Sequence, residues 1–483
     1  MERVSRGTIC GWLLIPLLVP WLLGQQADPS AEHVRHIERG LLPPVRVTNR
    51  TIPSLDLRDE MRLRHVPAVS IAVVREGRLE WARAYGVVAE GGAAATTQTR
   101  FQAASISKSI AATGVMRLVE AGRLSLDAPI NDVLKSWQLP AGNSSASHPV
   151  TLRALLSHTA GTTVHGFGGY AAGEPQPSLV QVLNGEKPAN SPPVVCDQEP
   201  GHEFRYSGGG YVIAQQAMVD ATGQPFPWLL QQTVLGALEM SHSTYEQPLP
   251  AELREQIAWP VDEQGQAIAG GPHVYPEMAA AGLWTTPSDL AKWLIAMQQS
   301  LAGREPHLLS QASARAMLTP VKGDYGLGVE TWSSDGVIHF SHGGANAGYR
   351  AQYAADSAGG GVVIMTSSDA GGVLIGEILR TVAAEYGWPK YRQTERTAAD
   401  VPMEEQRAHV GQFKASDGFA FSVSAGEDAL SIRFSDGVTG PFLPADRKTW
   451  FAVQSTLQVR FESADAGELV FAPDDTVAFS RVP

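Results

Sequence analysis

Strand signals at both ends of a long helical stretch are the feature that most constrains the fold of this chain. Apolar runs on either side of the turn at Glu76-Gly77 predict a strand pair over residues 68–86. Strand signals return only over residues 325–367, with short links between them, and a closing helix is predicted over 374–386. Because short links favour antiparallel pairing, we expect both ends to form one antiparallel sheet beside a helical lobe.

The hydrophobic period changes to two near the C-terminus. Phe419, Phe421 and Val423 alternate with polar residues, and the runs at 430–434 and 457–461 do the same. Such alternation predicts strands with one buried face, and hence a small all-β domain, either a barrel or a sandwich. The predicted organisation is a signal peptide over 1–27, a main domain over 28–392, a linker over 393–407 and the β domain over 408–483.

The first residues have the pattern of an export signal. Arg3 and Arg6 precede a short apolar stretch over residues 9–23, and polar residues follow it. This stretch is shorter than the ~20 residues of a membrane span. We therefore expect cleavage near residues 24–27, an exported periplasmic or extracellular protein, and no stable membrane span afterwards; an uncleaved anchor is the alternative. Cys196 would then be the sole cysteine, which excludes an internal disulfide.

The composition and charge narrow the possible partners. Hydrophobic residues make up 43% and charged residues 18% of the 483 residues, which is enough to build a sizeable core. The net charge is −12 and no compact run of Lys and Arg occurs, whereas nucleic-acid binding needs a basic surface. We expect a small-molecule or peptide substrate and no nucleic acid, and the oligomeric state stays open.

A lysine lies within a predicted apolar helix, three residues after a serine. Ser105 and Lys108 share one face of that helix, because residues i and i+3 are about one turn apart. A buried lysine is costly unless it is paired, and a serine hydroxyl needs a base before it can act as a nucleophile. The pair therefore predicts an activated nucleophile; the alternative is a surface lysine whose stem covers the core.

Two glycine-rich stretches follow later in the chain. In "EFRYSGGGY", Tyr206 and Ser207 precede three glycines, and in "IHFSHGGANAGY" a predicted strand reaches His342, Gly343 and Gly344. Glycine permits close approach of the backbone. The missing side chains would let a substrate lie along the strand edge.

The order of these three motifs resembles that of the penicillin-recognising serine hydrolases, which include class C β-lactamases, DD-peptidases, D-aminopeptidases and related esterases. The stretches "LLSHTAG" and "GLWTTPSDLAKW" also look like this superfamily, and the resemblance covers about residues 57–388. It implies an α+β fold, with a β-lactamase/transpeptidase-like antiparallel sheet flanked by helices and a helical lobe. The small β domain is similar to C-terminal additions on some of these hydrolases.

The resemblance also implies roles for the motif residues. Ser105 would attack a carbonyl group and form an acyl-enzyme, Lys108 would assist its deprotonation, and Tyr206 would be the general base. The backbone N–H groups of Ser105 and Ala345 would form the oxyanion hole. No cofactor and no metal is required. His342 would complete the catalytic set, and the residues expected to bind substrate are Ser207, Gly208, Gly343 and Gly344.

Two positions depart from the best-known pattern of the superfamily. Gly208 stands where many members carry Asn, and His342 stands where β-lactamases usually carry Lys. Histidine is mostly neutral at pH 7, so it would hold a β-lactam carboxylate less well than lysine does. We therefore expect weak β-lactam turnover, and the His-x-Gly motif looks more like the D-aminopeptidase and esterase side of the superfamily.

Three functions remain open on this basis. The first is an exported serine hydrolase that cleaves an ester or amide, and the second is a D-aminopeptidase or DD-peptidase acting on cell-wall peptides. The third is a catalytically silent binding module, against which the intact Ser105, Lys108 and Tyr206 argue. His158 and His165 are expected to make loop hydrogen bonds rather than bind a metal. Glu277 is expected to be a solvated carboxylate.

Overall fold

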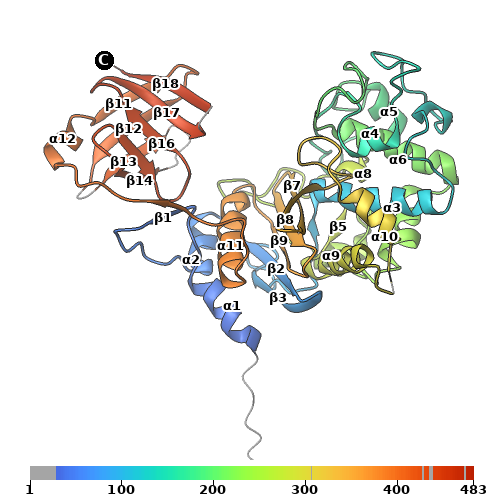
Figure 1. Ribbon diagram of the computed structural model, residues 1–483, viewed down its shortest axis with the longest axis horizontal. Helices are drawn as coiled ribbons and strands as arrows, with labels where there is room; N and C mark the ends of the chain where they lie inside the picture. Colours follow the sequence, from blue (N-terminus) through green and yellow to red (C-terminus); the bar gives the residue numbers. More distant parts are fainter. Residues whose placement is uncertain (1–28, 306, 427–428, 435–438, 473–474, 483) are drawn as a thin grey trace, which may run out of the picture.

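The computed structural model describes residues 29–482, apart from gaps at 306, 427–428, 435–438 and 473–474. The predicted signal peptide lies outside these described residues. Figure 1 shows the main domain with its sheet and helical lobe, and the C-terminal β domain beside it. Within the described ranges, no helix is both long enough and apolar enough to cross a membrane.

The main domain is built on a six-stranded sheet in the order β3-β2-β9-β8-β7-β6, with antiparallel neighbours throughout. Strand β2 pairs with β9, from Val69 opposite Thr366 to Val74 opposite Gly361, and so joins the two ends of the domain. This confirms the predicted single antiparallel sheet. Its strands are β2 (Ala68–Arg75), β3 (Arg78–Gly86), β6 (Glu330–Ser334), β7 (Val337–Asn346), β8 (Tyr349–Asp356) and β9 (Gly361–Thr366).

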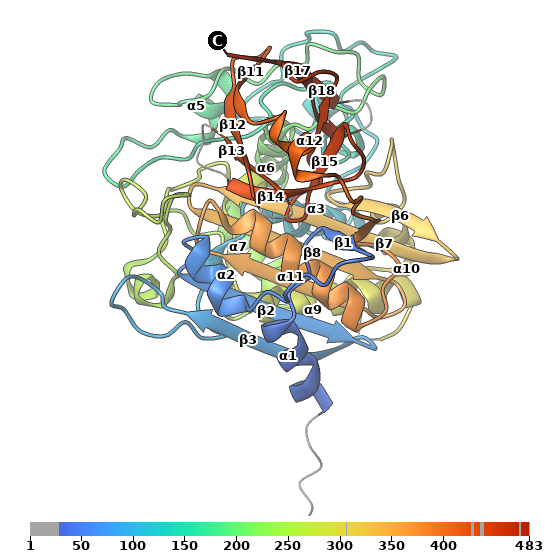
Figure 2. The same ribbon diagram turned by 90° about the vertical axis from the view of Figure 1, so that its left-hand side faces the viewer.

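Helices cover both faces of this sheet. Side chains of β2 alternate between them: Val69, Ile71 and Val73 pack with α11, whereas Ala72 and Val74 pack with α9. Figure 2 shows α11 lying across the face that is turned to the viewer. Because β2 has a packed helix on each side, buried residues occupy both of its faces, and its residues are apolar apart from Ser70 and the terminal Arg75. The helices are α11 (Gly371–Glu385) with α1 (Pro29–Arg39) and α2 (Leu57–Leu63) on one side, and α9 (Pro287–Ala302) and α3 (Ser107–Glu120) on the other.

The helical lobe fills the chain between β3 and β6. Its helices are α4 (Leu152–Leu156), α5 (Leu179–Asn184), α6 (Gly208–Thr222), α7 (Phe226–Leu230), α8 (Met278–Ala281) and α10 (Gln311–Met317). Shorter elements connect them: β4 (Phe101–Gln102), β5 (Trp284–Thr285), the 3-10 turns η1 (Ala104–Ile106), η2 (Ile130–Asp132) and η4 (Ala251–Gln256), and the π turn η3 (Gln231–Leu235). The lobe and the sheet share one large apolar core.

The C-terminal β domain is a closed eight-stranded barrel, one of the two architectures that the alternating pattern predicts. Its interior is filled by packed aromatic and aliphatic side chains, among them Phe413, Phe421 and Trp450. Among the described strands of this domain, closure leaves each strand paired on both sides. The strands are β11 (Gly411–Ala415), β12 (Ala420–Ala425), β13 (Leu430–Phe434), β14 (Thr439–Pro444), β15 (Thr449–Ala452), β16 (Gln458–Phe461), β17 (Ala466–Ala472) and β18 (Asp475–Arg481).

Residues 393–407, for which a linker is predicted, carry β10 (Thr394–Arg396) and α12 (Met403–Arg407). Strand β10 pairs in parallel with β1 (Val45–Val47) near the start of the chain. The apolar residues of this pair then pack against Leu443, Phe451 and Val453 of the barrel. The connection is therefore a packed contact between the N-terminal segment and the barrel, which a local pattern of charged residues does not reveal.

Candidate active site

Ser105 lies in the η1 turn directly before α3. The preceding residue, Ala104, has a φ of 48°, a left-handed conformation that is uncommon for a residue other than glycine. Strand β7 packs against this turn so closely that a Cβ atom on Gly344 would lie 2.3 Å from the Ala103 carbonyl oxygen. The glycine therefore lets the third motif lie directly beside Ser105, and the contact holds the Ala103–Ser105 turn in place.

Lys108 is buried in the helix that follows, with 2% of its surface exposed. Its Nζ donates a hydrogen bond of 2.9 Å to Ser105 Oγ and one of 2.8 Å to the carbonyl oxygen of Ala280 in α8. Burial and these two partners exclude the alternative of a surface lysine. Helix α3 carries Lys108, and the Ala280 carbonyl oxygen of α8 keeps its amine group next to the Ser105 hydroxyl.

Tyr206 lies next to Lys108. The distance from Lys108 Nζ to the centre of the Tyr206 ring is 5.0 Å. Tyr206 directly precedes Ser207, whose hydroxyl accepts a hydrogen bond of 3.0 Å from the Gly210 N–H and caps α6. The start of α6 also packs tightly against a loop, because a Cβ on Gly209 would lie 2.6 Å from the Thr163 carbonyl oxygen. The cap and this packing fix the position of Tyr206, which directly precedes the N-cap residue of α6.

Two of the residues that were expected to bind substrate, Ser207 and Gly208, lie away from the cavity at Ser105. Ser207 is 1% exposed, and its hydroxyl donates to the Thr163 carbonyl oxygen at 2.7 Å in addition to capping α6. Gly208 is also buried, and neither residue lines the cavity at Ser105. Both residues shape the loop that carries Tyr206, so a role in direct substrate contact does not follow from their position.

His158 contacts the segment that carries Tyr206 and Ser207. Its Nδ1 accepts a hydrogen bond of 3.1 Å from the Ser207 N–H, and its ring lies 4.2 Å from the Tyr206 ring, centre to centre. Burial, with the nearby Lys108, lowers the pKa of His158 well below its usual value, so the ring is neutral and Nδ1 can accept. The structure thus gives His158 a loop hydrogen bond, and the described residues contain no cluster of metal-ligating side chains.

His342 has both ring nitrogens occupied. Nδ1 lies 2.6 Å from the Gly343 carbonyl oxygen, which can only accept, so Nδ1 carries the proton. Nε2 then accepts from the Tyr325 hydroxyl at 3.0 Å. Burial and the nearby Lys108 lower the pKa of His342 to about 3. His342 is therefore a neutral wall of the site, and it supplies no cation where β-lactamases usually have one. Sequence reasoning missed Tyr325, because it belongs to none of the three motifs.

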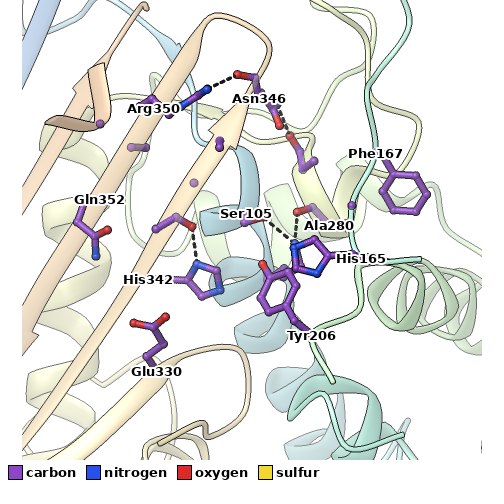
Figure 3. A pocket seen from close by; sticks show the side chains of 18 of the residues that line it. Ser105, His165, Phe167, Tyr206, Ala280, Glu330, His342, Asn346, Arg350 and Gln352 are labelled. Carbon is purple, nitrogen blue, oxygen red and sulfur yellow. Dashed lines mark hydrogen bonds between the residues drawn. The ribbon is translucent and has the colours of Figure 1, made fainter. Parts of the chain in front are cut away.

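These groups meet in one cavity of about 600 Å³. Ser105, Lys108 and Tyr206 line it with Gly343, Gly344 and Ala345 of β7, and Figure 3 shows the side chains. Strand β6 pairs with β7 only as far as Glu330 opposite Ser341, so the β7 edge beyond that point has no strand partner on the β6 side within the described residues. An extended substrate can therefore lie along this edge, and Ala345, which is exposed, is placed to offer its backbone N–H.

Glu277 is buried rather than solvated, which corrects the expectation from sequence. It has no exposed surface, and its Oε2 has no hydrogen-bond partner among the described residues. The Tyr170 hydroxyl lies 3.5 Å from its Oε1. Burial is the main cause that raises the pKa of Glu277 to about 7. The residue lies at the start of α8, three positions before the carbonyl group that holds Lys108.

We expect Glu277→Gln to change how stability depends on pH. Because folding raises the pKa of Glu277 from 4.5 to about 7, its favourable contribution is complete below about pH 4.5 and is lost as the pH rises through about 7. This difference corresponds to about 3 kcal/mol. The glutamine variant has no charge to lose, so its gain in free energy of unfolding over wild type should grow from pH 5 to pH 8. Urea unfolding of both proteins at several pH values measures this difference in free energy of unfolding. Glu462→Gln, on the exposed barrel surface, is the control, and parallel pH curves for Glu277→Gln and wild type would contradict the assignment.

The fold and the site define a class of protein. A serine that is hydrogen-bonded to a buried lysine, beside a tyrosine and a glycine-lined strand edge of an antiparallel sheet, is the arrangement of a serine hydrolase that forms an acyl-enzyme. Residues 56–387 match the family model described as Beta-lactamase. The chain therefore belongs to the beta-lactamase family, in agreement with the resemblance of its motifs.

Relatives of known sequence lie in the same superfamily. The chain is 29% identical over 302 residues to penicillin-binding protein 4 of Amycolatopsis lactamdurans, a match that covers 59% of this chain and 76% of that protein. It is 20% identical over 255 residues to protein flp of Staphylococcus aureus (strain MW2), which covers 52% of this chain. That match spans 49% of protein flp, or about half its length.

Solved structures show the same fold. An octameric penicillin-binding protein homologue from Pyrococcus abyssi has a TM-score of 0.60 at 20% identity, covering 88% of this chain and 98% of that one. A D-amino acid amidase from Ochrobactrum anthropi SV3 has a TM-score of 0.54 at 22% identity, covering 68% of this chain and 96% of that one. At these identities the likeness concerns the fold.

Proposed function

We propose that this chain is an exported serine hydrolase that cleaves an ester or amide through an acyl-enzyme on Ser105. The observation that carries the proposal is the buried Lys108, with its Nζ 2.9 Å from Ser105 Oγ. A buried ammonium on a serine hydroxyl stabilises negative charge that develops on that oxygen. A silent binding module has no need of such a costly group.

The reaction follows from this geometry. Tyr206, acting as a phenolate beside the Lys108 ammonium, takes the proton of the Ser105 hydroxyl, and the serine oxygen attacks the substrate carbonyl carbon. The backbone N–H groups of Ser105 and Ala345, two residues that line the cavity, would receive the resulting oxyanion. When the bond to the leaving group breaks, the proton passes to the departing alcohol or amine. Water, deprotonated by Tyr206 in the same way, then attacks the acyl carbon and releases Ser105 and the acid.

The charges in the cavity favour substrates without a free carboxylate next to the scissile bond. His342 is neutral and fully hydrogen-bonded, Lys108 is used by Ser105 and Ala280, and Arg350 is paired with Asp369 at 2.8 Å. We therefore propose an esterase or amide-hydrolysing activity, with weak turnover of β-lactams. Hydrolysis of D-amino-acid amides is the second candidate, which the neutral His342 and the likeness to a D-amino acid amidase support.

The test is intact mass spectrometry after incubation with a fluorophosphonate probe. One adduct on the wild type, absent from Ser105→Ala and retained in the barrel variant Ser463→Ala, is the expected result. The same spectrum reports whether the predicted signal peptide has been removed from protein that was expressed with it. No adduct on the wild type, or an adduct that persists in Ser105→Ala, would favour the binding module. A panel of esters, D-amino-acid amides and β-lactams then ranks the substrates.

A further inference from the structure

The cavity at Ser105 continues past the part of β7 that β6 leaves unpaired, to the other face of the sheet. On the side of the helical lobe it is lined by Ser105, Tyr206 and His342, and on the side of α11 by Gln352, Glu330 and Ile375. In Figure 3, Gln352 and Glu330 lie on one side of His342, and Ser105 and Tyr206 lie on the other. The part of the cavity lined by Gln352, Glu330 and Ile375 is called the outer arm below. The assignments of the three motifs do not use this outer arm.

Gly343 lies at the centre of the outer arm. It points to the face of Gln352, because a Cβ atom on Gly343 would lie 3.0 Å from Gln352 Oε1. In the strand register, Gln352 of β8 lies opposite Gly343, and Glu330 of β6 lies opposite Ser341. The Cα atoms of Glu330 and Gln352 are thus about 12 Å apart, from the usual strand spacing and rise. Both long side chains can reach one group that sits over Gly343.

The outer arm presents hydrogen-bond acceptors. Gln352 Nε2 donates to the Tyr353 carbonyl oxygen at 3.0 Å, which leaves Oε1 to face the cavity, and within the described ranges no donor reaches that atom. Glu330 is exposed, and Ser341 Oγ donates to its Oε2 at 2.9 Å. In the described part of the chain, no donor is bound to Glu330 Oε1. A ligand group that completes these contacts must supply N–H or O–H donors.

The charges favour a cationic donor. Lys390 interacts with Glu330, but its ammonium group lies 3.1 Å from the centre of the Trp332 ring and is held there. Arg350, which does line the cavity on this face, is paired with Asp369. Ile375 of α11 adds an apolar wall. An aminoalkyl chain fits this combination, with its methylene groups against Ile375 and its ammonium group between the two acceptors.

We propose that Glu330 and Gln352 form a subsite for a protonated amine, reached across Gly343, so that the preferred substrates carry an aminoalkyl group on the chain that lies along β7. This inference rests on the proposed hydrolase function and specifies its substrate class. The absence of a side chain at Gly343 has a clear use here, because it opens the passage from Ser105 to the outer arm.

The test compares fluorophosphonates that differ only at the end of the alkyl tail, which is either a primary ammonium or a methyl group, over a series of tail lengths. The measured quantity is the ratio of the two rates of adduct formation on Ser105, from intact mass. At the best length, wild type should favour the ammonium tail about fivefold, as expected for one partly exposed ion pair, and 0.5 M salt should reduce this ratio.

Variants assign the preference to the outer arm. Glu330→Gln should bring the ratio close to one, Glu330→Lys should reverse it, and Gly343→Val should lower it by closing the passage. Glu404→Gln, which removes an exposed acidic charge of α12, the helix that packs against barrel strand β12, is the matched control and should retain the wild-type ratio. A ratio of one in wild type at every tail length, or a preference that survives in Glu330→Gln, would overturn the subsite. The absence of any adduct with either tail would instead reject the hydrolase function.

Discussion

Lys108→Met is expected to lower the rate of acylation of Ser105 by at least about 1,000-fold, in the range typical for loss of a general acid-base group. The substitution removes the group that lies 2.9 Å from Ser105 Oγ while keeping a chain of similar length. Tyr206 alone then faces the serine without the nearby cation. The rate of fluorophosphonate labelling and the turnover of a simple ester measure the effect.

The fold should survive this substitution. Replacing a buried charge with an apolar side chain of similar size is often close to neutral for stability, although the Ala280 carbonyl oxygen loses its partner, at a cost of about 1–3 kcal/mol. Thermal unfolding therefore separates loss of chemistry from loss of structure. Lys414→Met, on the exposed face of barrel strand β11, is the matched control. A Lys108→Met protein that labels within tenfold of wild type would reject the role of Lys108.

Gly344→Ala should have the second large effect. The new Cβ would lie 2.3 Å from the Ala103 carbonyl oxygen, and backbone atoms of a packed turn cannot move aside as a flexible side chain can. Either β7 or the Ala103–Ser105 turn must shift, and a displacement of about 1 Å at the nucleophile costs on the order of 100-fold in rate. Overpacking should also lower the free energy of unfolding by about 1–3 kcal/mol.

Two measurements test this expectation together. The rate of Ser105 labelling should fall about 100-fold, and the midpoint of thermal unfolding should decrease. Gly440→Ala in the barrel is the control, because nothing lies within 4 Å of a Cβ at that position. Labelling of Gly344→Ala at the wild-type rate would show that the close packing of β7 on the turn does not position the nucleophile.

Local patterns were sufficient for the main architecture. Strand signals separated by short links favour antiparallel pairing within residues 68–86 and within residues 325–367. The pairing of β2 with β9, which joins the two segments into one sheet, was expected from the fold as a whole and is fixed by packing. The alternating apolar residues after Phe419 predict the barrel strands in the same way, since period two leaves one face to be buried. The pair Ser105 and Lys108 is also local, because i and i+3 on a helix must share a face.

Other features depend on contacts between distant segments. The pairing of β10 with β1 joins residues more than 340 positions apart, and neither short segment has a distinctive pattern of its own. Glu277 carries a charged side chain that sequence alone would place in solvent, yet it is fully buried at the start of α8, with the Tyr170 hydroxyl 3.5 Å from its Oε1. His342 was expected to be mostly neutral at pH 7 from the ordinary pKa of histidine, and burial and the Tyr325 hydroxyl, which no local pattern reveals, hold it neutral.

The sequence by itself determined the antiparallel strands, an all-β C-terminal domain and the spacing that places Ser105 near Lys108, because these depend on spacing along one strand or one helical turn. Only the tertiary structure decided which groups share the cavity, that Ser207 caps a helix, and that Glu330 and Gln352 lie on either side of Gly343. The physical reason is that burial, pKa and hydrogen-bond partners are set by neighbours in space. Those neighbours come from α8, the Tyr325 loop and strands β6 and β8, which only packing brings to Ser105.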